Sequence, residues 1–86
     1  MVTVRLPASL QPLAGGAARV ESDGATLRAV FDDLDRRFPG IAERLLEAGA
    51  VRGDVMIAVG SDETRDLDAP LPDDSEVHIL PAIAGG

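Results

Sequence analysis

The sequence of 86 residues lacks several residue types on which catalytic and metal sites depend. It contains no cysteine, so neither a disulfide nor a thiolate ligand or nucleophile is available. Its one histidine, His78, makes a poor transition-metal site without cysteine, and is better explained as an outward-facing strand residue. No serine stands at a recognisable spacing from a base. We therefore expect that the chain is not an enzyme and that it binds no metal or cofactor itself.

Lysine is also absent, and the charge is strongly negative. All eight basic side chains are arginines, and the formal net charge is −7. Residues 1–60 hold eight acids and seven arginines (net −1), whereas residues 61–86 hold seven acids and one arginine (net −6). This balance, with only two aromatic side chains, disfavours nucleic-acid binding. The acidic end is either a solvated loop or a surface that steers a cationic partner.

No run of roughly eighteen apolar residues exists, so we expect no membrane-spanning segment. The opening MVTVRLP shows no basic start followed by an apolar stretch, as a secretory signal would. Together with the missing cysteine, this predicts a cytoplasmic protein.

Alternating apolar residues predict four strands. In MVTVRLP, Val2, Val4 and Leu6 fall on one face, which is typical of a half-buried strand. The predicted strands cover residues 2–6, 17–22, 55–59 and 76–81, with room for a very short strand within 63–74. The second strand should run antiparallel to the first after a long connection.

The segment TLRAVFDDLDRRFPG predicts the main helix. Thr26 can accept a hydrogen bond from an unpaired amide at its start, and Pro39-Gly40 ends it. The apolar stripe that should face the core consists of Leu27, Val30, Phe31, Leu34 and Phe38.

Two ion pairs are expected on the wet side of this helix, Asp32 with Arg36 and Asp33 with Arg37, because each pair is four residues apart. After the helix, Ile41, Leu45 and Leu46 predict one more short helical turn over the core.

One main helix on a mixed sheet of four to five strands defines an α+β fold. If the last strand pairs in parallel with the first, the fold is a β-grasp (ubiquitin-like) roll. We predict that residues 1–80 form this domain and that residues 81–86 form a flexible C-terminal Gly-Gly tail.

A single helix covers one face of the sheet and leaves the other open. The predicted members of the open face are Thr3, Arg5, Met56, Ala58, His78 and Leu80, followed by Ile83. An apolar patch with an acidic rim predicts a partner surface. The alternative is a set of scattered surface hydrophobic residues, which is common.

The close of the sequence, ILPAIAGG, is the remaining candidate for chemistry. Pro81 stiffens the root, and the side chains then taper to Gly85 and Gly86. Such a segment can thread a narrow channel, and glycine allows another enzyme's backbone to approach the last carbonyl. If a partner joins the terminal carboxylate to AMP, the leaving group becomes a phosphate, and sulfur or another nucleophile can attack the carbonyl.

These features resemble the ubiquitin-like sulfur carriers, the family that includes ThiS, MoaD and CysO. The resemblance covers essentially the whole chain, and PDDSEVHILPAIAGG is its most specific part. ATLRAVFDDLDRRFPGIAERLL resembles the family's helix and following turn, and the opening and ending resemble the CysO branch. Gly60 and the short segment AGAVRGD (48–54) depart from the family pattern.

The resemblance implies that an E1-like adenylyltransferase and sulfurtransferase uses ATP to adenylate Gly86 and then converts it to a thiocarboxylate. Gly85 would let the tail thread into the enzyme. In the CysO branch the sulfur acceptor is a PLP-dependent cysteine synthase, and a metalloprotease releases cysteine. The open face and the tail together give the predicted partner-binding residues, which are Met56, Ala58, His78, Leu80, Pro81, Ile83 and Ala84.

Three other functions stay open at this point. The chain could be the small subunit of molybdopterin synthase, whose tail enters a large subunit. It could be a ubiquitin-like modifier that joins Gly86 to lysines of other proteins. It could also be a binding module in which the two glycines have no role.

Overall fold

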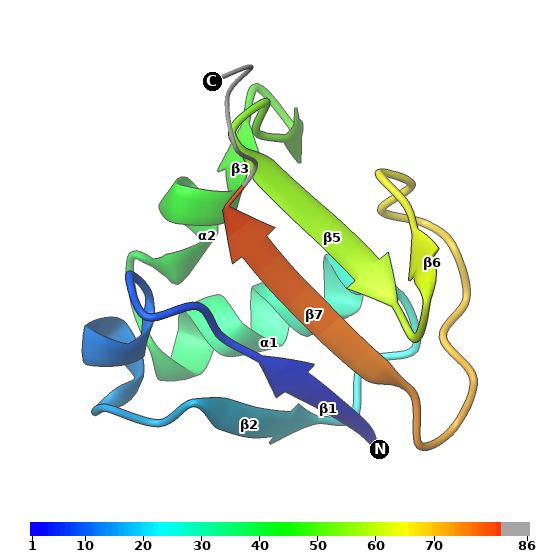
Figure 1. Cartoon of the computed structure of the whole chain (residues 1–86), viewed down its shortest axis with the longest axis horizontal. Coiled ribbons are helices and arrows are strands. Elements are labelled where there is room, and N and C mark those ends of the chain that lie inside the picture. Colours follow the sequence, from blue (N-terminus) through cyan, green and yellow to red (C-terminus); the bar gives the residue numbers. More distant parts are fainter. Residues whose placement is uncertain (82–86) are drawn as a thin grey trace.

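The computed structural model describes residues 1–81. Two helices and a 3-10 turn accompany seven strands in this range (Figure 1). Their bounds, in chain order, are β1 Val2–Arg5, η1 Gln11–Ala14, β2 Arg19–Ser22, α1 Leu27–Arg37, α2 Ile41–Leu45, β3 Leu46–Glu47, β4 Ala50–Val51, β5 Val55–Val59, β6 Asp62–Glu63 and β7 Glu76–Pro81.

Five strands form one mixed sheet in the order β2-β1-β7-β5-β6. β1 and β7 pair in parallel at its centre, with Val4 opposite Val77, and the other pairs are antiparallel. α1 crosses one face of this sheet, and Figure 1 views the sheet from the other side. The predicted β-grasp roll, with the first and last strands parallel, is confirmed.

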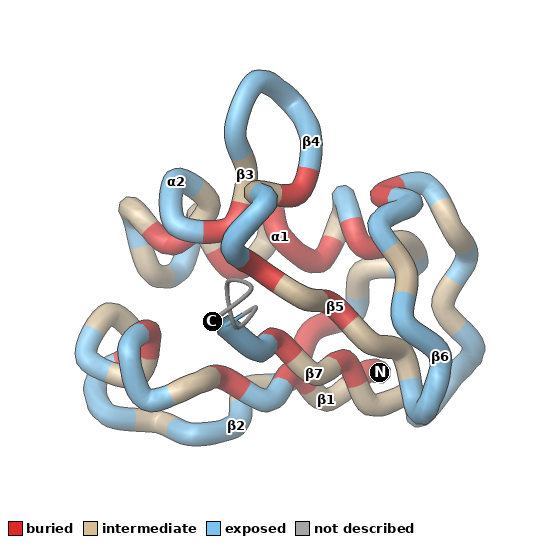
Figure 2. Tube along the Cα trace, turned by 45° about the horizontal axis from the view of Figure 1, so that its top comes forward, coloured by how far each residue is buried: buried red, intermediate tan, exposed pale blue. Residues whose placement is uncertain are grey.

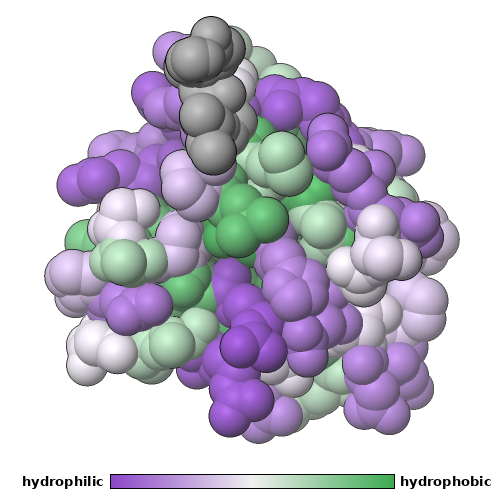
Figure 3. Space-filling view, viewed as in Figure 1, coloured by the Kyte–Doolittle hydropathy of each residue, from purple (hydrophilic) through white to green (hydrophobic). Residues whose placement is uncertain are grey.

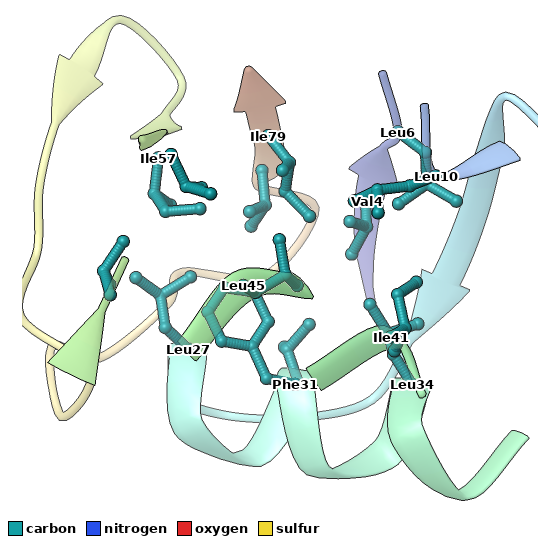
Figure 4. Close-up of a cluster of buried hydrophobic side chains, with 14 of the residues drawn as sticks. Val4, Leu6, Leu10, Leu27, Phe31, Leu34, Ile41, Leu45, Ile57 and Ile79 are labelled. Atoms are coloured by element: carbon teal, nitrogen blue, oxygen red, sulfur yellow. The ribbon is translucent and has the colours of Figure 1, made fainter. Parts of the chain in front are cut away.

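The core lies between the sheet and the helices. Val4 and Ile57 from the sheet and Phe31 from α1 are fully buried. Figure 4 shows side chains of the strands pointing toward those of α1 and α2. The buried apolar residues are Val2, Val4, Leu6, Leu10, Ala14, Leu27, Val30, Phe31, Leu34, Ile41, Leu45, Val51, Val55, Ile57, Leu67, Val77 and Ile79. Each large one contributes roughly 1.5–3 kcal/mol by leaving water, so this cluster dominates stability.

Helix α1 begins as predicted, but one of its ion pairs differs. The Thr26 hydroxyl accepts a hydrogen bond from the Ala29 amide at 3.2 Å. Asp33 pairs with Arg37 at 3.0 Å as expected, yet it also takes Arg36 at 2.8 Å, so the predicted pair of Asp32 with Arg36 was wrong. The Ser22 hydroxyl donates to Asp33 at 2.9 Å, which fixes this carboxylate where both guanidinium groups reach it.

The prediction from the sequence omitted a small hairpin and misplaced two element boundaries. β3 and β4 pair antiparallel around a turn in which Ala48 and Gly49 have φ of 54° and 80°. Leu46, predicted to be helical, already lies in β3. The expected short strand is β6, which begins at Asp62, one residue before the predicted range of 63–74. Strands of two residues are too short to show alternation, so the pattern carried no signal for them.

Candidate functional site

The open face of the sheet brings together the residues that the sequence predicted for it. Met56 lies opposite Leu80, and Ala58 lies opposite His78, on the paired strands β5 and β7. Leu80 is 45% exposed, while Met56 and Ala58 are half-buried. Figure 3 shows hydrophobic residues gathered over the upper parts of β5 and β7, with hydrophilic residues around them. We call Met56, Ala58 and Leu80 the open-face patch.

The lower part of the same face is polar and paired. The Nε2 atom of His78 lies 3.0 Å from Oε1 of Glu76, and Nη1 of Arg5 lies 3.5 Å from the same oxygen. Arg5 stands beside His78 in the parallel register of β1 and β7. His78 is half-buried, and it lies between this charged cluster and the open-face patch.

The root of the tail lies at the upper end of β7. Pro81 is the last described residue, and it lies opposite Val55 of β5. By strand alternation it belongs to the face of Val77 and Ile79, not to that of Leu80. The predicted site residues Ile83, Ala84, Gly85 and Gly86 lie outside the described residues. Met56, Ala58, His78 and Leu80 share one face, and Pro81 adjoins them from the other.

Pro81 borders a cavity of about 290 Å³, which we call the tail-root cavity. In Figure 2 the end of the described chain lies between α2 on one side and the segment after β1 on the other. Its lining combines buried apolar residues with three charged ones, Arg44, Arg52 and Asp54, which we call its rim. The lining consists of Pro7, Ser9, Leu10, Arg44, Leu45, Arg52, Asp54, Val55, Ile79, Leu80 and Pro81.

The rim of this cavity is held by several hydrogen bonds. Arg52 joins the loop to α2, since its amide donates to the Leu45 carbonyl at 2.9 Å. The guanidinium of Arg65 donates to the carbonyl of Val51, to that of Arg52 at 3.0 Å and to that of Val55 at 3.2 Å. One side chain thereby fixes the backbone between β4 and β5.

The two arginines of the rim differ in their partners. Arg52 pairs with Asp54 at 3.1 Å, and this hydrogen bond raises the pKa of Arg52 above its usual value. Arg44 is exposed in the last turn of α2 and has no ion pair among residues 1–81. Neither arginine was predicted as a site residue from the sequence, because no motif links side chains from two separate segments to a strand end.

Two further observations concern the described part of the chain. Among residues 1–81, no three histidine, aspartate or glutamate side chains lie together as a metal ion requires. None of the helices in that range is both long and apolar enough to cross a membrane. Separately from these absences, the described surface has an apolar patch and a charged cavity, which are features suited to binding another protein.

Comparison with known proteins identifies the family. The model of the ThiS family matches residues 4–86. The sulfur carrier protein CysO of Mycobacterium tuberculosis is 40% identical, over 99% of this chain and 98% of its own length. The aligned length of 91 positions exceeds the 86 residues of this chain, so the alignment contains gaps here.

Solved structures agree with this assignment. A chain of the BexX/CysO complex of Amycolatopsis orientalis superposes with a TM-score of 0.92 at 34% identity, covering 100% of both chains. The small archaeal modifier protein 1 (SAMP1) of Methanosarcina acetivorans superposes at 0.83 with 26% identity, over 99% of this chain and 95% of its own. Sulfur carriers of this family are substrates of other enzymes and are not enzymes themselves, which confirms the prediction of a carrier. The chain belongs to the ThiS family, and its likeness to CysO supports a sulfur-carrier role.

Proposed function

We propose that the chain carries sulfur as a thiocarboxylate on Gly86. The observation that supports this most is the match to a sulfur-carrier family, which continues through residue 86 and so includes both glycines. The position of Pro81 at the upper end of β7 also supports it, because residues 82–86 then start from the edge of the fold. Five residues can extend at most about 17 Å, enough to enter a partner's active site.

The chemistry requires a partner that uses ATP. The Gly86 carboxylate attacks the α-phosphate of ATP, which forms an acyl-adenylate and releases pyrophosphate. A sulfide-level nucleophile then forms a carbon–sulfur bond at the same carbon, and the bond to AMP breaks. The products are AMP and the thiocarboxylate. In this scheme the chain supplies the acyl group and a docking surface, and an E1-like adenylyltransferase and sulfurtransferase supplies catalysis.

The open-face patch supports this division of labour. Met56 and Leu80 lie opposite each other beside the tail root, and no second layer of the described chain covers them. We propose that the activating enzyme contacts this patch while the tail enters its active site. Ile83 and Ala84 would contribute to the contact within the channel, and Gly85 would leave room around the reacting carbonyl.

The test is reconstitution with the activating enzyme, ATP and a sulfur donor. Mass spectrometry should show the exchange of one oxygen for one sulfur at the C-terminus. A control chain with one alanine appended after Gly86 should show no exchange, because its reactive carboxylate is displaced and a methyl group is added. Exchange in the control without trimming, or no exchange in the unmodified chain, would contradict the proposal.

The likeness to CysO also leads us to propose the acceptor. We infer that a PLP-dependent cysteine synthase takes the sulfur and that a metalloprotease then releases cysteine from the carrier. Incubation of the thiocarboxylate form with such a synthase and its amino-acid substrate should yield a chain extended by cysteine. If the sulfur stays on the carrier while another acceptor removes it, this branch is wrong and the carrier role stands.

A second candidate is protein modification, which the likeness to SAMP1 favours. Adenylation is common to both functions, and they diverge at the nucleophile. A modifier would join Gly86 to lysine side chains of other proteins, giving isopeptide-linked adducts in cells. We expect no such adducts under conditions in which the thiocarboxylate forms.

A further inference from the structure

The tail-root cavity has a charge opposite to that of most of the molecule. The chain has a net charge of −7, yet the rim of this cavity carries the guanidinium groups of Arg44 and Arg52 and the carboxylate of Asp54. Asp54 lies 3.1 Å from Arg52, so these two charges largely offset each other. Among the residues that line the cavity, the charge that remains is therefore that of Arg44, while Glu47, outside the lining, also interacts with Arg52.

The surroundings of Arg44 favour an ion pair with an incoming group. Leu45, Val55 and Ile79 of the lining are buried core residues, so an acidic side chain that enters the cavity leaves part of its water and gains more from a charged partner than it would on the open surface. Arg44 also lies in the last turn of α2, so its charge is compatible with the negative end of that helix.

The rim is built before any partner arrives. The Arg65 guanidinium donates to three backbone carbonyls, at the end of β4, in the following loop and at the start of β5. The Arg52 amide donates to the carbonyl of Leu45, the residue next to Arg44. α2 and this loop are therefore linked, and the side chains that border the cavity start from a fixed backbone. A fixed backbone confines the conformational entropy lost on binding mainly to the side chains that make the contact.

We propose that the tail-root cavity binds an aspartate or glutamate side chain of the activating enzyme, with Arg44 as the principal contact. This inference rests on the proposed function, because it assumes an enzyme that takes the tail. Such an enzyme must lie against the root of the tail, where Leu80 and Pro81 border the cavity. The contact would lie beside the open-face patch, since Leu80 belongs to both, and would fix the position from which the tail enters the active site.

Charge reversal at Arg44 tests the proposal, and Arg19 provides a matched control. Both arginines are exposed and have no ion pair among residues 1–81, and Arg19 lies on the edge strand β2. Arg44→Glu and Arg19→Glu change the net charge equally, so a general electrostatic effect alters both alike. Calorimetric titration with the purified activating enzyme should show a Kd raised at least about tenfold for Arg44→Glu. For Arg19→Glu the change should stay below about twofold, and the ratio should fall at high salt.

A chain with a C-terminal carboxamide, made by chemical ligation, identifies the source of the carboxylate. If the partner supplies it, the effect of Arg44→Glu persists in the amidated chain. If the chain's own terminal carboxylate occupies the cavity, the effect disappears there, and the proposal is wrong. Circular dichroism of each variant should show an unchanged fold.

Adenylation of the unmodified chain, measured as pyrophosphate release, separates failure of this inference from failure of the proposed function. If the chain is adenylated but the two arginine variants bind equally well, the cavity has no role and the carrier function stands. If the unmodified chain is never adenylated, the proposed function fails, and this inference fails with it.

Discussion

The two faces of the sheet are formed by the same strands but differ in burial. On β5, Ile57 points to the core and is fully buried, while its neighbour Met56 points outward and is half-buried. On β7, Ile79 and Leu80 show the same contrast, at 2% and 45% exposure. The inner face pairs with the helices and sets the fold. The outer face has no second layer in the described chain, so its apolar residues contribute less to stability and are available for a partner.

The largest expected difference between the two faces is in stability. Ile57→Ala removes a fully buried side chain and leaves a cavity, which should cost about 2–5 kcal/mol of the free energy of unfolding. For a domain of 86 residues the total is about 4–13 kcal/mol, so this change alone should lower the melting temperature markedly. Met56→Ala, one position away on the outer face, should cost less than about 1 kcal/mol. Equal losses in urea titrations would show that the outer face is also part of the core.

The next largest effect is expected on the inner side of the sheet, where the loop that carries Gly24 packs closely against α1. A Cβ at Gly24 would lie 2.6 Å from the Val30 amide nitrogen and 2.8 Å from its Cγ2 atom. Gly24→Ala must therefore move the backbone at the start of α1 and should cost about 1–3 kcal/mol. Gly53→Ala provides the control, because a Cβ there meets no atom within 4 Å. Thermal unfolding in which both variants behave alike would contradict this account of Gly24.

A smaller effect is expected from the hydrogen bond that joins Ser22 of β2 to Asp33 of α1. The hydrogen bond from Ser22 lowers the pKa of Asp33, and Arg37 and Arg36 lower it further. Because the pKa is depressed in the folded state, the link stabilises fully above the unfolded value of about 4 and is lost as pH falls through the folded value. Asp33→Asn should cost about 1 kcal/mol at neutral pH, and this cost should shrink below about pH 4. Melting temperatures against pH would check this, with Asp32→Asn, an exposed neighbour, as the variant expected to show a much smaller change.

The inner face is also the part of the molecule that the sequence predicts best. Val55, Ile57, Val77 and Ile79 alternate with outward residues, and burial follows that alternation because one face must leave water. The ion pairs of α1 were harder to predict, since helical spacing allows both Asp32 and Asp33 to reach an arginine. The hydrogen bond from Ser22 favours Asp33, and Ser22 is eleven residues away in sequence and adjacent only in the folded chain.

The candidate site shows the same limit. Alternation placed Met56, Ala58, His78 and Leu80 on one face without any structure, because they lie on two regular strands. The tail-root cavity could not be predicted, because Arg44, Arg52 and Pro81 come from three separate segments. The hairpin of β3 and β4 precedes the loop that carries Arg52, and its two-residue strands left no pattern to read.

The smallest expected effect on stability is at Leu80 of the outer face, where we expect the larger effect to be on binding. Leu80→Thr introduces a β-branched residue, which suits a strand, and removes an exposed apolar side chain, so the free energy of unfolding should change by less than about 0.5 kcal/mol. If the open-face patch contacts the activating enzyme, the same change should weaken binding several-fold, because an apolar anchor is lost from the interface. Thr3→Ala, on the same face beside Glu76, is the control and should leave binding unchanged. Binding that tolerates Leu80→Thr as well as Thr3→Ala would mean that the exposed apolar residues of the open face are no more than ordinary surface, and that the enzyme recognises the tail and its root alone.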